Sequence, residues 1–303
     1  MQKWFCGVVG FSVLIAAPAA IGAAPTPEEL AYQKTIADIA ATIQSQYGDV
    51  SIAPANVTFH LGQDYYFIGE SDARRIIVEA WNNPPNVAEG VLGLVFKKGE
   101  DFNHSLWSAV VTYDPSGYVT DSDAKTADYG ELIAKWRAQE PQINAERKEG
   151  GYPLQHLIGR AQPPSYDPAR HTMIWAQDIQ FGDEQDHTLS YDVRILGRNG
   201  VLSLNMISGM SSLAEVRQAA QSLAQTVDFN KGARYADFDP NLDKKAGYGL
   251  AGLVAAGLGV AATKKLGLLA LLAAFGKKLI ALAVVAVAVI GRFLRSRFGK
   301  RDG

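Results

Sequence analysis

Two neighbouring segments of alternating apolar and polar residues constrain the fold of this chain most strongly. In residues 188–196 the apolar side chains of Leu189, Tyr191, Val193 and Ile195 alternate with the polar side chains of Ser190, Asp192 and Arg194. Residues 201–206 repeat the pattern, and Asn199-Gly200 lies between the two segments. A period of two is typical of strands with one buried and one polar face, and Asn and Gly both tolerate the positive φ of a type I′ turn. The pattern therefore predicts an antiparallel hairpin closed by a two-residue turn.

The rest of the central sequence predicts more strands and several helices. Strands are expected at 50–52, 57–61, 91–96, 106–113 and 172–181, and helices at 25–48, 71–81, 129–148 and 211–227. The first helix has a clear start, because Thr26 can cap it and Pro27 suits its first turn. We expect an α+β fold, an antiparallel sheet with helices mainly on one face, followed by C-terminal transmembrane helices.

The N-terminus has the pattern of a secretory signal. Lys3 precedes an apolar run at 5–17, which is too short to span a bilayer comfortably, and small residues follow it. We therefore assign residues 1–23 to a signal peptide and 24–243 to an α+β extracytoplasmic domain. Cys6 is the only cysteine and would leave with the signal, which excludes disulfides and thiolate chemistry in the mature chain.

The C-terminus is apolar and basic. We assign residues 246–294 to membrane-anchoring helices and 295–303 to a basic tail. From Lys264 onward the chain has nine Lys or Arg and one acid, although its net charge is -2. Basic residues flanking apolar runs are typical of a membrane boundary. The remaining chain is acidic, which disfavours binding to nucleic acid. The number of crossings stays open, because two candidate spans conflict with the charge rule.

Small residues recur every four positions at the start of the predicted anchor, at Gly247, Ala251, Ala255 and Gly259. Such a stripe allows close helix packing in lipid, although glycine-rich apolar helices also show this spacing by chance.

The stretch GGYPLQHLIGRAQPPSYD, residues 150–167, gathers several candidate binding residues. These are Tyr152, Pro163, Pro164, Tyr166 and Asp167. His156, Ser165 and Asp167 are the residue types of acyl transfer, but no nucleophile elbow accompanies them. Pro163-Pro164 favours extended geometry. We therefore favour a rigid connector whose tyrosines pack down or contact a partner, over a catalytic site.

The segment 228–245 links the last predicted helix to the predicted anchor. Tyr235 and Phe238 are its large aromatic residues. Our hypothesis is that they dock the domain against the membrane surface or a membrane partner.

Metal and cofactor motifs are weak. Asp183, Glu184, Asp186 and His187 are close in sequence, but a solvated hairpin turn would have the same composition. The stretch beginning at Asp121 lacks the glycine and the final acid of a calcium loop. We predict no metal site and no cofactor.

Four ordered blocks resemble a known family. They are GGYPLQHLIGRAQPPSYD, MIWAQDIQF, LSYDVRILGRNGVLSLN and FNKGARYADFDPNLDKKAGYGLAGLVA. Together they resemble the uncharacterised bacterial membrane-anchored proteins of domain of unknown function 2167. The resemblance implies a membrane-anchored protein without an assigned activity. Arg160 departs from the family pattern, in which an aromatic residue is expected.

These observations favour a non-enzymatic binding or interaction protein of the bacterial envelope. It would sit in the inner membrane with its main domain on the periplasmic or extracytoplasmic side. Its expected partners are the lipid bilayer and an envelope protein or membrane helix. Two alternatives remain: an envelope hydrolase using acids such as Asp167, Asp178 and Asp192, and a subunit of a membrane complex assembled through the C-terminal helices.

Overall fold

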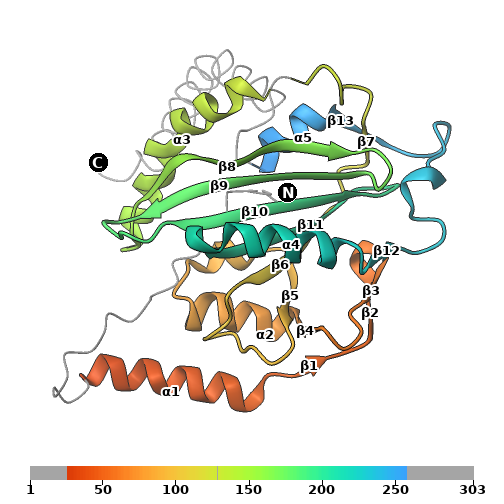
Figure 1. The fold of residues 1–303 in the computed structure, drawn as a ribbon. Coiled ribbons are helices and arrows are strands. Elements are labelled where there is room, and N and C mark those ends of the chain that lie inside the picture. Colours follow the sequence, from red (N-terminus) through yellow and green to blue (C-terminus); the bar gives the residue numbers. More distant parts are fainter. Residues whose placement is uncertain (1–25, 128, 258–303) are drawn as a thin grey trace, which may run out of the picture. The chain divides into compact units, whose positions relative to one another are not determined.

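A large antiparallel sheet organises the domain (Figure 1). The computed structural model describes residues 26–127 and 129–257. The predicted signal peptide, most of the predicted anchor and the basic tail lie outside these residues. In spatial order the strands of the sheet are β1 (Ser45–Gln46), β4 (Tyr65–Gly69), β5 (Val91–Lys97), β6 (Ser108–Asp114), β11 (Val201–Gly209), β10 (Thr188–Leu196), β9 (Thr172–Phe181) and β8 (Gln155–Asp167). Their neighbours all pair antiparallel, so the predicted α+β class with an antiparallel sheet is confirmed.

One face of the sheet packs against helix α4 (Leu213–Ala224) and a small second sheet. That sheet has the order β12 (Val227–Phe229), β3 (Val57–His60) and β2 (Asp49–Ile52). Val216, Ala220 and Leu223 recur at helical spacing and form the buried stripe of α4. They pack with Leu189, Tyr191 and Val193 of β10, so the apolar face predicted from the alternation is confirmed.

The opposite face carries two separate apolar clusters under different helices. Over β4, β5 and β6 lie α1 (Pro27–Thr42), α2 (Glu70–Arg75), its π-helical continuation η2 (Ile76–Ala80) and the 3-10 turn η3 (Pro85–Ala88). Over β8 and β9 lie α3 (Gly130–Glu149) and α5 (Leu250–Gly257). The helices are therefore mainly on one face, as expected, but α4 covers the other.

The polar side of β10 is buried, contrary to the expectation of one solvated face. Ser190, Asp192 and Ser203 are each at most 2% exposed. They lie between the two apolar clusters, and neighbouring polar side chains on the same face supply hydrogen bonds. Arg194 Nη2 donates to Asp192 Oδ1 at 2.7 Å, and Asn205 Nδ2 donates to the Ser190 hydroxyl at 3.0 Å. The alternation of residues predicts which side chains share a face of the strand, but it does not show whether the polar face is covered by other elements. When that face is buried, its polar side chains must form hydrogen bonds with one another.

The hairpin between β10 and β11 is longer than the predicted two-residue turn. Leu196 pairs with Val201, which leaves Gly197 to Gly200 as a four-residue loop closed by a Gly197 N–H bond to the Gly200 carbonyl at 2.8 Å. Gly200 does not have positive φ. Glycine is needed here because the chain passes close to β6: a Cβ on residue 200 would lie 2.2 Å from the Asp114 carbonyl oxygen. The type I′ assignment is therefore wrong.

The start of the predicted membrane anchor belongs to the folded domain. β13 (Lys245–Gly249) pairs in parallel with β7 (Tyr118–Thr120), and Leu250, Leu253 and Val254 of α5 are buried against the third cluster. Gly247 thus lies in a strand, and only Ala251 and Ala255 of the predicted stripe are in a described helix, because Gly259 lies outside the described residues. A single helical stripe beginning at Gly247 is therefore wrong.

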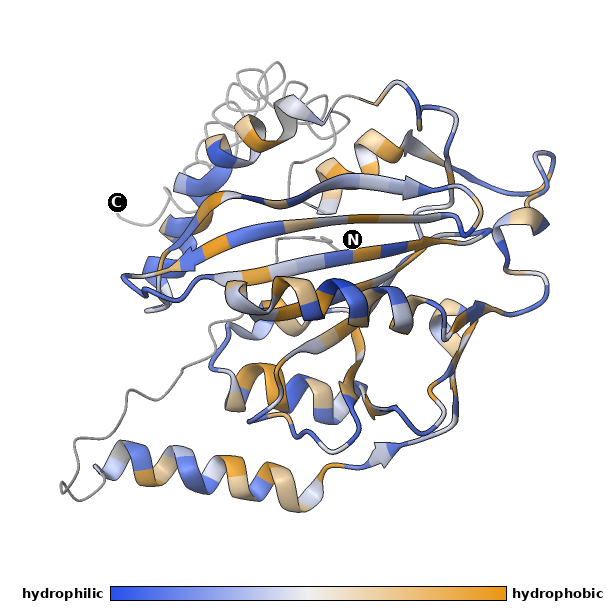
Figure 2. Ribbon diagram, in the orientation of Figure 1, coloured by the Kyte–Doolittle hydropathy of each residue, from blue (hydrophilic) through white to orange (hydrophobic). Residues whose placement is uncertain are grey.

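Helix α5 is mostly apolar, whereas α3 is largely hydrophilic (Figure 2). Within residues 26–127 and 129–257, each helix is too short or too polar to cross a bilayer.

Asp123 fixes the start of α5. Its carboxylate accepts from the backbone N–H groups of Leu250 at 2.9 Å and Ala251 at 3.2 Å, so it caps a helix far away in sequence. A carboxylate at a helix N-terminus satisfies free N–H groups and interacts favourably with the helix dipole.

Asp123→Ala is expected to lower the free energy of unfolding by about 0.5–2 kcal/mol, the usual cost of a lost cap. Limited proteolysis should then cut residues 246–257 faster than in the unsubstituted protein. Asp183→Ala, in an exposed hairpin turn, serves as the control and should change neither measurement. Equal proteolysis of the Asp123→Ala variant would show that α5 does not depend on this cap.

Candidate functional site

Most of the stretch at 150–167 forms edge strand β8, from Gln155 onward, rather than a connector. Side chains of α3 bond its free edge. Asn144 pairs with both the N–H and the carbonyl of Gln155, Glu140 accepts from the Leu157 N–H, and Arg137 donates to the Ile158 carbonyl. Farther along, Pro163-Pro164 has no N–H to offer. The edge is therefore protected against pairing with another strand.

Register shifts in β8 decide which way its side chains point. The strand is irregular between Arg160 and Gln162 and again between Gln162 and Ser165, where extra residues oppose β9. Gln162 Oε1 accepts from the Tyr191 hydroxyl at 3.2 Å and from Arg217 Nε at 2.9 Å, on the α4 side of the sheet. Bulges commonly re-aim side chains in this way. One strand thereby contributes to hollows on both faces of the sheet.

The larger hollow lies between α4 and strands β8 to β10, and we call it the α4 cleft. Its volume is about 380 Å³, within the usual range for ligand pockets of roughly 300–1,000 Å³. Ile174, Val193, Ala220 and Ala224 provide apolar surface. The polar lining comes from Ser165, Asp167, Arg170, Thr172, Tyr191, Gln221 and Gln225. The cleft therefore offers a ligand both apolar contact and several hydrogen-bonding groups.

Three of the aromatic candidates meet in one cluster at the far end of β8. The Tyr118 ring stacks on Tyr235 at 4.4 Å and on Phe238 at 3.9 Å between centroids, and His171 stacks on the other side of Tyr235 at 4.1 Å. Tyr166 joins through its hydroxyl, which donates to Asp121 Oδ2 at 2.8 Å and lies 3.2 Å from His171 Nδ1. Burial and the neighbouring Asp121 carboxylate raise the pKa of Tyr166, so its hydroxyl stays protonated and acts as a donor.

The cluster is mainly a packing element. Tyr235 is 8% exposed and its hydroxyl donates to the Val119 carbonyl at 3.1 Å. Phe238 is half-buried, with Lys245 Nζ 5.8 Å from its ring centroid. Of the two residues in the docking hypothesis, Phe238 is therefore the more accessible, and the hypothesis rests on it rather than on Tyr235.

The other candidates in the stretch are apart from this cluster. Tyr152 lies beyond the opposite end of β8, where its backbone N–H bonds the Arg147 carbonyl. Pro163 is exposed, Pro164 lines the smaller hollow, and Asp167 lines the α4 cleft.

The residue types of acyl transfer do not assemble. His156 Nδ1 lies 2.6 Å from Glu140 Oε1, and Ser165 is nine positions away on the same extended strand. At roughly 3.3 Å per residue this separation is about 30 Å, far beyond hydrogen-bond reach. His156, Ser165 and Asp167 thus form no triad.

The three acids of the hydrolase alternative also lie apart. Asp178 contacts His187 at 2.9 Å and Asp192 contacts Arg194 at 2.7 Å, each on its own side of the sheet. Asp167 is six or more strand positions from Asp178 on the β8–β9 hairpin. These acids do not form a carboxylate pair. The described residues also contain no group of three or more acids, histidines or cysteines arranged to hold a metal.

A comparison with models of known protein families identifies the family of this chain. A family model described as protein of unknown function (DUF2167) matches residues 44–288. The chain belongs to this family. The match spans every strand from β1 to β13, so the fold described above is that of a DUF2167 domain. No curated protein matches the chain.

Similarity of the DUF2167 domain to solved structures is low. The solution structure of PsbP (CyanoP) from the cyanobacterium Synechocystis sp. PCC 6803 has a TM-score of 0.34 at 13% identity, covering 62% of this chain and 92% of that one. The Ran-binding protein Mog1p of Saccharomyces cerevisiae has a TM-score of 0.29 at 10% identity, covering 65% of this chain and 100% of that one.

Sequence reasoning missed most of the α4 cleft. Ile174, Val193 and Ala220 look like ordinary core positions, because each is apolar in a strand or helix pattern. These residues come together around a hollow only because of the register of β8 against β9 and the position of α4 on the sheet. For this DUF2167 member, the available signals were Asp167 and Ser165, which sequence analysis considered for their place in the stretch at 150–167.

Proposed function

We propose that this protein is a non-enzymatic binding protein of the bacterial envelope, and that its DUF2167 domain holds a ligand in the α4 cleft. The α4 cleft carries the proposal, since it has the volume of a ligand pocket and offers apolar surface beside several polar groups. The acids and histidines considered for catalysis are engaged in separate pairs. Asp167 and Arg170 at the rim would fix the orientation of polar groups, while Ile174 and Val193 would contact apolar ones.

We further propose that the domain faces the periplasm and is held at the inner membrane by the apolar segment after residue 257. The apolar run near the N-terminus supports this placement. The lysines and arginines that flank the C-terminal apolar runs support it as well. Fractionation of cells making the full chain should recover it with membranes, lacking its first residues. Recovery from the cytosol with Met1 still attached would contradict the placement.

Ligand binding in the α4 cleft can be tested by site-specific crosslinking in cells that make the full chain. A photoreactive residue at Gln221, which is exposed and lines the cleft, is expected to crosslink to the ligand or partner. The same residue at Ala214, which is exposed on α4 outside the cleft, is the matched control and should give no such product.

Filling the cleft should abolish that crosslink. Ala224→Phe places a ring on the floor of the cleft, with an overpacking cost of about 1–3 kcal/mol that a folded domain usually tolerates. Ala214→Phe should leave the crosslink unchanged. A crosslink at Gln221 that survives Ala224→Phe in folded protein would argue against the α4 cleft as the binding site.

A further inference from the structure

The α4 cleft exists because α4 covers only part of the sheet. The helix packs chiefly against β10 and β11, and strands β9 and β8 continue beside it (Figure 1). Ile174 of β9 and Ala224 of α4 therefore remain partly exposed in the cleft, and Val193 and Ala220 complete its aliphatic surface. Aliphatic side chains that stay in contact with water favour an apolar ligand, because its binding removes that surface from solvent.

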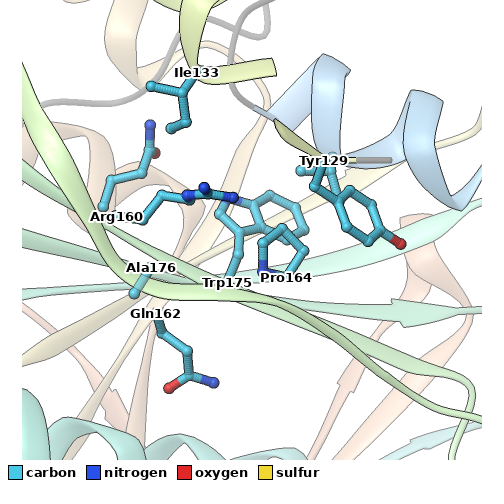
Figure 3. A pocket seen from close by; sticks show the side chains of 9 residues that line it. Tyr129, Ile133, Arg160, Gln162, Pro164, Trp175 and Ala176 are labelled. Carbon is cyan, nitrogen blue, oxygen red and sulfur yellow. The ribbon is translucent and has the colours of Figure 1, made fainter. Parts of the chain in front are cut away.

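The buried polar groups that line the cleft already have partners. The Tyr191 hydroxyl donates to Gln162 Oε1 at 3.2 Å, and the Thr172 hydroxyl donates to the Arg170 carbonyl at 3.1 Å. Figure 3 shows that Gln162 points away from Trp175, which lines the smaller hollow on the other face of the sheet. In the described part of the chain, none of the buried side-chain atoms that lack a hydrogen-bond partner belongs to the lining of the α4 cleft. A polar group inserted there would lose water and gain little, so the inserted part of a ligand is hydrocarbon.

The volume of the cleft indicates how much hydrocarbon it holds. An apolar cavity of about 150 Å³ binds one benzene molecule. The α4 cleft measures about 380 Å³, which by the same ratio accommodates on the order of fifteen carbon atoms. That matches a single fatty acyl chain and exceeds the side chain of any one amino acid. Among the described lining residues Tyr191 is the only aromatic one, and it is fully buried, so the cleft offers no ring face on which a nucleobase could stack.

The rim of the cleft carries one charge of each sign. Arg170 Nε lies 4.0 Å from Asp167 Oδ2, and both side chains are at least 50% exposed, so both remain available to a ligand. Ser165, Gln221 and Gln225 add uncharged hydrogen-bonding groups. A head group of one sign would be repelled by one of the two charges. A zwitterionic head group can pair its cation with Asp167 and its anion with Arg170.

We propose that the α4 cleft binds one fatty acyl chain of a membrane lipid whose zwitterionic head group lies at Asp167 and Arg170. This ligand assignment rests on the binding function proposed above for the α4 cleft. The acyl chain lies against Ile174 and Ala224, and Gln221 at the rim contacts the polar part of the lipid. Phosphatidylethanolamine, which carries an ammonium and a phosphate, has this chemistry. The membrane anchoring proposed above keeps such lipids within reach of the domain.

Photocrosslinking of the full chain in lipid vesicles tests the proposal. The chain carries a photoreactive residue at Gln221, and the vesicles contain phosphatidylethanolamine and phosphatidylglycerol in equal amounts. We expect irradiation to add the mass of one phospholipid to the intact protein, as measured by mass spectrometry. Phosphatidylethanolamine should exceed phosphatidylglycerol in the adducts by about twofold to fivefold, the range that one exposed ion pair provides. The photoreactive residue at Ala214, outside the cleft, is the control and should give no such preference.

Substitutions examine the floor and the rim separately. Ala224→Phe fills the cleft and should reduce the lipid adducts by about tenfold or more, because several CH₂ groups lose their contacts. Asp167→Asn keeps the oxygen that accepts from the Ala169 N–H and removes the negative charge, so it should abolish the preference for phosphatidylethanolamine. Asp183→Asn, in the exposed turn between β9 and β10, is the matched control and should leave the adducts unchanged. Circular dichroism shows whether each variant is folded.

The possible failures of the lipid assignment and of the binding function are distinguishable. If vesicles give no lipid adduct at Gln221 while cells give a protein or polysaccharide adduct there, the lipid assignment is overturned and the binding function of the cleft stands. The absence of any adduct in vesicles and in cells would overturn both, and so would lipid adducts that survive Ala224→Phe in folded protein. Equal labelling by the two lipids, unchanged by Asp167→Asn, would overturn the zwitterionic head group.

Discussion

Tyr235→Ala is expected to lower the free energy of unfolding by about 3–5 kcal/mol, the usual cost of removing a buried aromatic side chain. The substitution empties the centre of a stack in which Tyr118 and His171 pack on its two sides, at 4.4 and 4.1 Å between centroids. It also removes the hydroxyl that bonds the Val119 carbonyl. Chemical denaturation followed by circular dichroism measures the loss.

Two further variants separate the contribution of the Tyr235 hydroxyl from that of the stacked rings. Tyr235→Phe keeps the stack and loses only the hydroxyl, so it should cost about 1 kcal/mol. Phe238→Ala should cost less than Tyr235→Ala, because Phe238 is half-buried. If Phe238→Ala in folded protein changes neither complex formation nor domain orientation at the membrane, the docking hypothesis for this segment fails. A loss below about 1 kcal/mol for Tyr235→Ala would show that the cluster is not part of the core.

Arg194→Met is expected to lower the free energy of unfolding by about 3–5 kcal/mol at neutral pH, because it leaves the Asp192 carboxylate buried without its partner. Asp192 is 2% exposed, and Arg194 donates to it at 2.7 Å and also bonds the Ser203 hydroxyl. The double variant Asp192→Asn with Arg194→Met removes both charges and should recover a large part of the loss. Arg217→Met, an exposed arginine on α4, is the control and should change stability little.

The loss should depend on pH in a defined direction. Burial raises the pKa of Asp192, although the charge and hydrogen bond of Arg194 act to lower it. An acid whose pKa is higher in the folded state contributes stability that is complete below its unfolded pKa, about 3.9, and that is lost as the pH rises through its folded pKa. Removing Arg194 raises that pKa further, so Arg194→Met should be closest to the unsubstituted protein in acid and fall behind as pH rises. A loss that grows toward acidic pH would contradict this account of the buried pair.

The elements of the fold were largely accessible from local patterns. The helix starting at Thr26 is capped as predicted: Thr26 accepts from the Glu29 N–H, and the Glu29 carboxylate accepts from the Thr26 N–H. The apolar stripe of α4 and the alternation in β10 also agree with the structure. Caps and periodicity depend on residues three or four positions apart, or every second one, and such relations are visible in a sequence.

Short strands were less accessible. Residues 65–69 form β4, which sequence analysis missed, and the predicted helix at 25–48 ends at Thr42 before β1. Five residues carry too little periodicity to distinguish a strand from a turn or a helix end. Pairing with β5 and packing of Ile68 under α2 are what stabilise this strand.

The sequence by itself determined the α+β class, the order of the main strands and helices, the apolar face of β10 and the family of the chain. Tertiary structure alone decided that the polar face of β10 is buried, that Asp123 caps α5 from 127 positions away, and that bulges turn β8 toward two hollows. Such features depend on residues distant in the chain and on register. A change of one position in register moves every side chain to the other face without altering any local pattern.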